Sequence, residues 1–523
     1  MERPVTVNVR EVLKSNSKPV EPAGSGQSLY AARKKIYPKR ASGTFRQIKW
    51  LVMAVTLAIY YLAPWIRWDR GPYAPDQAIL VDLANRRFYF FFIEIWPQEF
   101  VLIAGLLVMA GAGLFLITSV AGRAWCGYAC PQTVWVDLFL VVERAVEGDR
   151  NARMKLDQAP WTAGKIGKKL VKHLIWIVIG VATGGAWIFY FADAPTLARD
   201  FVLGQAAPIA YFTVATLTST TYLLGGFMRE QVCTYMCPWP RIQAAMLDED
   251  SLTVTYNAWR GEPRSRGTKK SAAAGMVAGD CIDCDACVVV CPQGIDIRNG
   301  QQMECITCAL CIDACNNVMD KLGRDRGLIS YATLADYQHN MDIATLGGTK
   351  PINPALVRTP ESKLKAEVKH VRASHIFRPR TLFYFAIWAL VGIGILTTLV
   401  GRTRLELNVL HDRNPQFVTL SDGSIRNGYT VKILNMVPKP RTFTISISGL
   451  PGASISAPDA SKAPDGTFDV EAAPDRVHTF RVFVAAPAGS LGQEMTPFEF
   501  YVAEKDGTES AAYKAIFNAP EKK

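Results

Sequence analysis

Residues 281–315 have the sequence CIDCDACVVVCPQGIDIRNGQQMECITCALCIDAC, in which eight cysteines follow two copies of one spacing. In this spacing, three thiolates from one tight turn bind three corners of a cubane 4Fe-4S cluster, and the fourth cysteine binds a second cluster. The expected ligand sets are therefore crossed: Cys281, Cys284, Cys287 and Cys315 for one cluster, and Cys305, Cys308, Cys311 and Cys291 for the other. A tetrahedral zinc site would need separate groups of four ligands. The stretch predicts two clusters and a chain that moves single electrons.

The other four cysteines form a second repeated motif, CxxxCP. Cys126 and Cys130 lie in CGYACP, and Cys233 and Cys237 lie in CTYMCP, each after an apolar segment. Proline disfavours the α conformation in the residue before it and suits the first turn of a helix, so we expect Cys130 and Cys237 at helix starts. Helix N-termini favour the thiolate. If the two segments pack about a pseudo-twofold axis, four thiols gather as a metal or redox site; the alternative is buried cysteines that close helix ends.

All 12 cysteines fall between Cys126 and Cys315. An exported disulfide framework would spread cysteines through the secreted part, so this clustering indicates metal ligation in a reducing compartment. The chain has 523 residues, enough for about three domains. With 49% apolar residues, 20% charged residues and a net charge of +12, it is neither disordered nor collagenous. Apolar segments alternating with basic ones indicate an integral membrane protein rather than a nucleic-acid-binding one.

Five uncharged stretches are long enough to cross a bilayer as helices. They are Trp50 to Ile66, Phe100 to Ala121, Leu174 to Ala192, Phe201 to Met228 and Thr381 to Gly401. Buried helices of a large soluble protein are the alternative, but such helices carry a polar stripe. The aromatic run Phe88 to Phe92 is expected at the outer interface.

Basic residues lie before the first span, in the loop from Arg123 to Lys169 and before the last span, and they predict which ends stay in the cytoplasm. They are Arg33, Lys34, Lys35, Lys39, Arg40, Arg46, Lys49, then Arg144, Arg150, Arg153, Lys155, Lys165, Lys168, then Lys363, Lys365, Lys369, Arg372, Arg378 and Arg380. An alternating path puts all three groups inside. The first apolar run begins near residue 50, so we expect an uncleaved anchor rather than a signal peptide.

This path divides the chain into five parts. We expect a basic cytoplasmic segment (residues 1–47), four spans with both CxxxCP turns (48–248), a cytoplasmic ferredoxin-like domain (249–380), a fifth span (381–401) and an outer β domain (402–523). The outer part has alternating runs between Pro, Gly and Asp clusters: Gly428 to Met436, Thr442 to Ser448, Val477 to Val484 and Phe498 to Glu504. Such runs predict an immunoglobulin-like sandwich that serves as a binding or packing module.

Three histidines are weaker candidates. His173, at the inner end of the third span, could ligate haem or contact a quinone, although an interfacial position beside Lys172 is the simpler interpretation. His370 and His375 lie in a basic run before the last span, where phospholipid contact is the simpler account.

Together, the CGYACP and CTYMCPWPR turns, the ferredoxin run, five spans and an outer β domain resemble the FixG/RdxA/CcoG family of cytochrome c oxidase accessory proteins, which are membrane polyferredoxins. The resemblance covers the chain from about Ile36 onward. It implies a multi-pass protein of the bacterial inner membrane, with its N-terminus and ferredoxin domain cytoplasmic and its C-terminal domain periplasmic. It also implies a role in assembling cbb-type oxidase, as a reductase that converts Cu(II) to Cu(I).

Under that resemblance, Cys126, Cys130, Cys233 and Cys237 are the candidate copper-reducing residues, and the cluster ligands are the relay. Thiolates and thioethers prefer Cu(I) to Cu(II), which agrees with this assignment and with Met236 nearby. The implied partners are membrane lipid, copper chaperones or oxidase assembly factors, and an electron donor that is quinol, flavodoxin or ferredoxin; nucleic acid is not expected. Two alternatives remain: a quinol-oxidising polyferredoxin that feeds a periplasmic reductase, and a redox-sensing scaffold for oxidase subunits.

Overall fold

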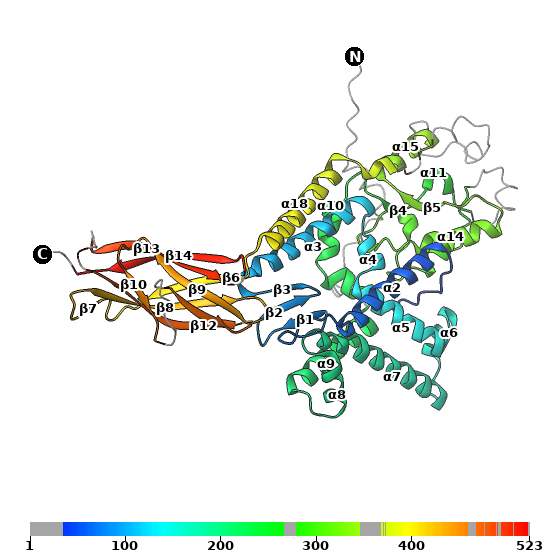
Figure 1. Ribbon diagram of the computed structural model, residues 1–523. Helices are drawn as coiled ribbons and strands as arrows, with labels where there is room; N and C mark the ends of the chain where they lie inside the picture. Colours follow the sequence, from blue (N-terminus) through cyan, green and yellow to red (C-terminus); the bar gives the residue numbers. More distant parts are fainter. Residues whose placement is uncertain are drawn as a thin grey trace, which may run out of the picture.

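The computed structural model describes residues 35–265, 279–345, 368–369, 371, 373–458, 467–474, 476–487, 489, 493–505 and 507–520. Figure 1 shows a β-sandwich at one end, long helices in the middle and the cysteine-rich domain at the other end. The predicted topogenic or lipid-contacting residues Arg33, Lys34, Lys363, Lys365, His370 and Arg372 lie outside the described residues.

Four helical segments among the described residues are long and apolar enough to cross a membrane. They are Thr44–Trp65, Pro97–Ala121, Ala163–Tyr190 and Pro379–Gly401, and each contains most or all of a predicted span. The regular α-helices within them are α2 (Thr44–Leu62), α3 (Phe100–Ala121), α7 (Ala163–Gly185) and α18 (Pro379–Gly401). Helices α3 and α18 lie side by side.

The predicted fourth span, residues 201–228, is not one helix. Helix α8 (Ala194–Val202) ends inside it, Gly204 adopts a φ of 76°, and α9 (Pro208–Thr221) begins with a proline in its first turn. A left-handed glycine followed by proline is a helix boundary, so the lack of charge did not mean continuity. Helix α9 continues as the π-helix η4 (Tyr222–Met228). Its hydroxyl-rich residues 218–221 lower its hydropathy, and a fifth crossing stays a prediction.

Helix α2 begins six residues before the predicted first span. Two of its basic residues are buried in ion pairs with Asp137 of α5 (Pro131–Glu147): Arg46 Nη1 lies 3.2 Å and Lys49 Nζ 2.9 Å from Asp137 Oδ2. The start of the same helix is fixed to the cysteine-rich domain, because the backbone N–H groups of Phe45 and Arg46 donate to Asp313 at 3.2 and 2.8 Å. These pairs extend the helix beyond its uncharged part.

A small antiparallel sheet precedes α3, with strands β1 (Ile79–Asp82), β2 (Arg87–Phe90) and β3 (Ile93–Ile95) in that order. Strand β2 and the turn after it hold the aromatic run that was predicted at the outer interface. At the far end of α18, Arg402 donates to the Glu94 carbonyl at 2.6 Å and pairs with Glu99 at 3.1 Å. This sheet therefore connects the two helices to the start of the sandwich (Figure 1).

The sandwich consists of two antiparallel sheets that enclose a core including Tyr429, Phe443 and Phe500. One sheet has the order β10 (Ser454–Ser456), β12 (Arg476–Ala486), β8 (Ile425–Asn435), β6 (Leu405–His411), with β7 (Val418–Thr419) paired to β8. The other has the order β11 (Phe468–Ala472), β9 (Arg441–Ser448), β13 (Met495–Glu504), β14 (Ser510–Asn518). The four predicted runs correspond to β8, β9, β12 and β13.

The cysteine-rich domain lies in the chain between α10 (Trp239–Met246) and α18. Its paired strands are β4 (Thr253–Tyr256) and β5 (Ile329–Ala332), and its helices include α11 (Ala258–Gly261), α13 (Ala286–Val289), α14 (Leu310–Lys321) and α15 (Leu334–Thr345). A buried cluster that includes Val254, Ile312 and Met319 forms its centre.

Candidate iron-sulfur and thiol site

The two predicted cluster loops have the same unusual backbone. In the first loop Asp283 and Asp285 have φ of 53° and 57°, and in the second Thr307 and Ala309 have φ of 56° and 59°. These are the second and fourth residues after the first cysteine of each copy. Alternation into the left-handed region turns successive backbone N–H groups inward, as in the concavities that hold Fe–S sites. The loops also end alike, because Asp285 and Ala309 are the N-cap residues of α13 and α14.

The eight thiols of these loops fall into two electrostatic groups. The Cys315 thiol interacts with those of Cys287, Cys281 and Cys284. The Cys311 thiol interacts most with those of Cys308, Cys305 and Cys291. All twelve cysteines of the chain are described and free. This donor set is compatible with 4Fe-4S clusters bound in the crossed arrangement, and the assignment of each ligand is taken up as a proposal below.

Burial dominates the electrostatics of both loops. It raises the pKa of Cys287 and of Cys291 to about 12, and the neighbouring thiols add to the effect. Arg298 opposes the burial effect at Cys287, and its guanidinium lies 2.6 Å from both Asp283 and Asp285. Arg298 therefore braces the two left-handed residues of the first loop while adding positive charge beside its thiols.

Each CxxxCP turn begins in the same way. Four residues before the first cysteine, Gly122 has φ 59° and ψ −128°, and Arg229 has φ 42° and ψ −110°. The second cysteine of each pair then donates its backbone N–H to the residue before the first: Cys130 to Trp125 at 2.9 Å and Cys237 to Val232 at 2.8 Å. The sequence repeat is thus a backbone repeat. Its first copy includes α4 (Ala124–Tyr128) and its second the π-helix η5 (Val232–Met236).

The predicted helix starts are present after both turns. Cys130 is the N-cap residue of α5, and Cys237 directly precedes Pro238, the N-cap residue of α10. A helix N-terminus lowers the pKa of a thiol, whereas burial raises the pKa of the first cysteine of each pair. It raises the pKa of Cys126 to about 12 and that of Cys233 to about 11, with the neighbouring thiols contributing.

The two halves pack crosswise. Helix α5, which follows the first turn, contacts η4, which precedes the second turn; α10, which follows the second turn, contacts α3, which precedes the first. Gln132 of α5 donates to the carbonyls of Leu224 at 2.9 Å and Arg229 at 3.2 Å. Gln243 of α10 donates to Thr118 of α3 at 3.1 Å. This exchange is compatible with the pseudo-twofold packing that the repeat predicts, and it brings the two turns together.

The four CxxxCP thiols lie close enough to influence one another electrostatically. Cys126 interacts electrostatically with Cys130, Cys233 and Cys237. Its Sγ donates to Gln243 Oε1 at 3.0 Å, and Cys126 is buried, whereas the other three are partly accessible. In the second turn Met236 is 53% exposed, so a soft thioether lies on the open side.

The first CxxxCP turn lies against the second cluster loop. A Cβ added to Gly127 would be 2.7 Å from the Ile306 carbonyl oxygen and 3.0 Å from Cys308 Cα, so only a glycine permits this approach. Cys126 belongs to one buried cluster with Ile306 and Cys308. Arg123 ties the parts together, since it donates to the carbonyls of Met303, Cys305 (2.9 Å) and Pro240.

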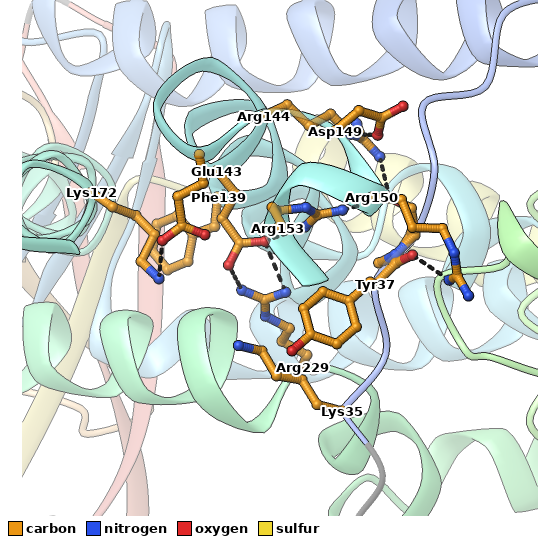
Figure 2. Close-up of polar contacts among 12 residues, drawn as sticks. Lys35, Tyr37, Phe139, Glu143, Arg144, Asp149, Arg150, Arg153, Lys172 and Arg229 are labelled. Carbon is orange, nitrogen blue, oxygen red and sulfur yellow. Dashed lines mark hydrogen bonds and ion pairs between the residues drawn. The ribbon is translucent and has the colours of Figure 1, made fainter. Parts of the chain in front are cut away.

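The second turn is fixed by a buried ionic network, shown in Figure 2. Glu143 of α5 pairs with Arg229 at 2.5 Å and with Arg153 of α6 (Arg150–Gln158) at 2.6 Å. Arg153 also donates to the Pro38 carbonyl at 2.6 Å, which holds the irregular segment before α2. Lys172 pairs with Glu147 at 3.0 Å. No local pattern in the sequence indicates this network, because it is formed by residues far apart in the chain.

Two of the histidine candidates, His173 and His375, have other partners than the thiols. His173 Nδ1 lies 3.1 Å from the Tyr222 hydroxyl, and the ring stacks on Phe227. It lines a cavity of about 380 Å³ together with charged residues, many of which are ion-paired. His375 lies 3.5 Å from Asp336. Neither contacts a cysteine among the described hydrogen bonds and ion pairs.

Comparison with known proteins agrees with this geometry. A family described as "4Fe-4S dicluster domain" matches residues 228–334, and one described as "4Fe-4S binding domain" matches residues 102–146. A third, described as an "IG-like fold at C-terminal of FixG", matches residues 395–520. Nitrogen fixation protein FixG of Rhizobium meliloti is 64% identical over 94% of both chains. This chain belongs to the FixG/RdxA family.

Two further relatives of the family come from Cereibacter sphaeroides. Protein RdxB is 52% identical over 94% of this chain and 97% of its own, and protein RdxA is 49% identical over 94% and 99%. A crystal structure of a FixG-related protein from Vibrio parahaemolyticus covers 22% of this chain and 97% of its own, at 18% identity and a TM-score of 0.20. The FixG-family chain is thus an iron–sulfur electron-transfer protein with apolar helices and an immunoglobulin-like domain.

Proposed function

We propose that this FixG-family protein is a cupric reductase of the bacterial inner membrane, which supplies Cu(I) for assembly of cbb-type cytochrome c oxidase. The observation that carries the proposal is the contact between the first CxxxCP turn and the Cys305–Cys308 loop. Four thiols lie in two turns beside the ferredoxin domain, and a metal ion that drew them together could receive an electron there. We also propose the crossed cluster ligands predicted from the sequence.

The 4Fe-4S clusters, when bound, supply single electrons. The chain provides the rest. Arg123 holds the second loop against the turn, and Gly127 permits their close approach. Cys130, Cys233 and Cys237 are partly accessible, and Met236 lies on the same turn, so a copper ion can reach soft ligands. Cu(II) takes up one electron from the ferredoxin domain and becomes Cu(I), which the thiolates favour.

The basic flanks support the proposed orientation. The segment before α2, the CxxxCP turns and the ferredoxin domain face the cytoplasm, and the sandwich faces the periplasm. Copper chaperones or oxidase assembly factors would then receive Cu(I), and the sandwich is the surface that could bind them.

A second candidate is a third 4Fe-4S cluster held by Cys126, Cys130, Cys233 and Cys237. It is favoured by the family match over residues 102–146, because that range contains only Cys126 and Cys130 of the 12 cysteines. Among the described residues, no group of three or more His, Cys, Asp or Glu side chains could hold a single metal ion. A copper ion would have to draw these thiols together, whereas a cluster could bridge them.

The double variant Cys130→Ser/Cys237→Ser tests both candidates. Serine keeps the size of each side chain but removes the soft ligand. For the cupric reductase, we expect loss of Cu(I) formation, followed with a Cu(I)-specific chelator, at an unchanged content of about eight iron atoms per chain. A fall from about twelve to about eight would establish the third cluster. Wild-type Cu(I) formation in the variant would refute the copper site.

Cys287→Ser is the control for the iron measurement. It removes one ligand of the first proposed set and leaves the CxxxCP turns intact. We expect it to disturb only that cluster, so that iron falls by no more than about four atoms per chain.

A further inference from the structure

An apolar cavity of about 380 Å³ adjoins the first CxxxCP turn on the membrane side. Helices α2, α5, α7 and α9 form its walls, and Ala129 and Pro131, the two neighbours of Cys130, line it. Its size is within the range of small-molecule sites. Trp187, which is 47% exposed, and the exposed Thr220 show that one side of the cavity is open, and α2 and α7, which form two of its walls, are candidate membrane spans.

Two hydroxyl groups of this cavity, those of Tyr60 and Thr220, can act as acceptors, whereas the indole N–H groups of Trp135 and Trp187 are donors. Tyr60 donates its hydroxyl proton to the Thr183 carbonyl at 2.6 Å. Thr220 donates its own to the Leu217 carbonyl at 3.0 Å. A hydroxyl that has donated its proton still has lone pairs that accept hydrogen bonds. The cavity therefore suits an apolar molecule that carries O–H donors.

We propose that this cavity binds the ring of a membrane-soluble hydroquinone, which is the electron donor of the thiol site. The inference rests on the proposed function, because it takes the CxxxCP cysteines to be redox-active. A hydroquinone has an apolar ring, two O–H donors and solubility in the bilayer, and each property corresponds to a feature of the cavity. A phospholipid acyl chain would match the walls but has no donor for Tyr60 or Thr220.

The reaction balances with the groups that the protein provides. Both O–H bonds of the hydroquinone break, giving the quinone, two electrons and two protons. The electrons would leave one at a time through the Cys130 turn, and two oxidised 4Fe-4S clusters, when bound by the ferredoxin loops, would accept one electron each. The protons pass to water at the membrane surface. Cu(II) can then take the electrons singly.

The cavity at His173 is a poorer quinol site. Its walls include Lys169, Lys172 and Glu143, which are engaged in ion pairs. An apolar ring there would bury charged groups away from water, which costs free energy.

Thr220→Phe tests the site, with Thr216→Phe as the matched control. Both residues are exposed threonines of α9, but only Thr220 lines the cavity, so only its replacement fills it. Full-length protein with its clusters reduced beforehand, in phosphatidylcholine vesicles, is titrated with decylubiquinol, and quenching of the total tryptophan fluorescence, to which the cavity residues Trp135 and Trp187 contribute, is measured. We expect saturable quenching in the wild type and in Thr216→Phe, and at least tenfold weaker binding in Thr220→Phe. Equal binding in all three proteins would overturn the proposal.

Tyr60→Phe keeps the volume of the cavity while removing the acceptor. We expect it to slow reduction of the clusters by decylubiquinol several-fold, followed by bleaching of their absorbance, while reduction by dithionite is unchanged. An unchanged rate with decylubiquinol would overturn the role of Tyr60 and of the cavity. If only Thr220→Phe weakens quinol binding but dithionite-reduced protein fails to form Cu(I), the proposed function is wrong and the quinol site stands.

Discussion

Replacing Gly127 with alanine should separate the CxxxCP turn from the cluster loop. Gly127 lies in α4, where its absent Cβ would meet only backbone atoms: the Ile306 carbonyl oxygen at 2.7 Å, Cys308 Cα at 3.0 Å and Cys308 N at 3.1 Å. Backbone atoms cannot rotate away as the end of a flexible side chain can. The added methyl group must therefore move the turn and the loop apart.

The size of the effect follows from these distances. An ordinary carbon contact begins near 3.4 Å, so the Ile306 carbonyl must move by about 0.7 Å. Overpacking of this kind costs about 1–3 kcal/mol. Alanine in a helix gains about 1 kcal/mol over glycine, which offsets part of the loss. The net destabilisation should be at most about 2 kcal/mol, whereas a displacement approaching 1 Å at a reacting centre can lower a rate by up to about 100-fold.

The assay compares Gly127→Ala with Gly111→Ala. Gly111 lies within α3, and a Cβ there would meet nothing within 4 Å, so alanine should leave the protein unchanged or stabilise it slightly. We expect Gly127→Ala to retain its iron and its absorbance but to form Cu(I) at least tenfold more slowly after reduction with dithionite. Wild-type rates and thermal stability in Gly127→Ala would refute the idea that the turn and loop are in functional contact.

Three further outcomes are expected. Glu143→Gln leaves Arg153 and Arg229 buried without their shared carboxylate and should cost about 3–5 kcal/mol, measured by thermal unfolding, whereas Asp320→Asn, which breaks an exposed pair with Arg326, should change little. Burial alone would raise the pKa of Asp157, but hydrogen bonds from Lys169, Lys35 and Tyr37 outweigh it and hold that pKa below its ordinary value. Its stabilising effect is thus present above about pH 4 and lost as the pH falls, so the stability difference between wild type and Asp157→Asn should shrink in acid; a constant difference would contradict this. Alkaline phosphatase fused after Lys523 should be active, and an inactive fusion there with an active one near residue 260 would invert the proposed orientation.

The sequence predicted those features that depend on local spacing. The β-strands follow from alternation, as in β8 with its buried Tyr429, Val431 and Ile433, whereas the crossed cysteine sets expected from the CxxCxxCxxxC intervals stay a proposal. Strand β6 could have been found by the same signal, since Leu405, Leu407 and Val409 are buried on one face. The left-handed backbone at Ala309 could not, because alanine has no local preference for that region.

Features that depend on distant contacts could not be predicted. Helix α2 begins before its uncharged part because Asp137, 91 residues away from Arg46, neutralises its first turns. The absence of charge over residues 201–228 suggested one span, but Gly204 and Pro208 interrupt it. The hydropathy of a stretch indicates which residues are buried, but it does not show whether one helix runs through the whole stretch. Two residues are enough to end a helix.

The crosswise packing explains why the CxxxCP motif occurs twice. One turn alone offers two thiols, fewer than the four that a 4Fe-4S cluster takes from a protein. Because α5 packs on η4 and α10 packs on α3, neither turn can leave the site without displacing the helix that follows the other. Arg123 then joins this pair of turns to the second cluster loop through Cys305 and Pro240, one residue from each partner. Under the proposed function, the repeat therefore acts as a pair, and the arginine before the first turn links that pair to the ferredoxin domain.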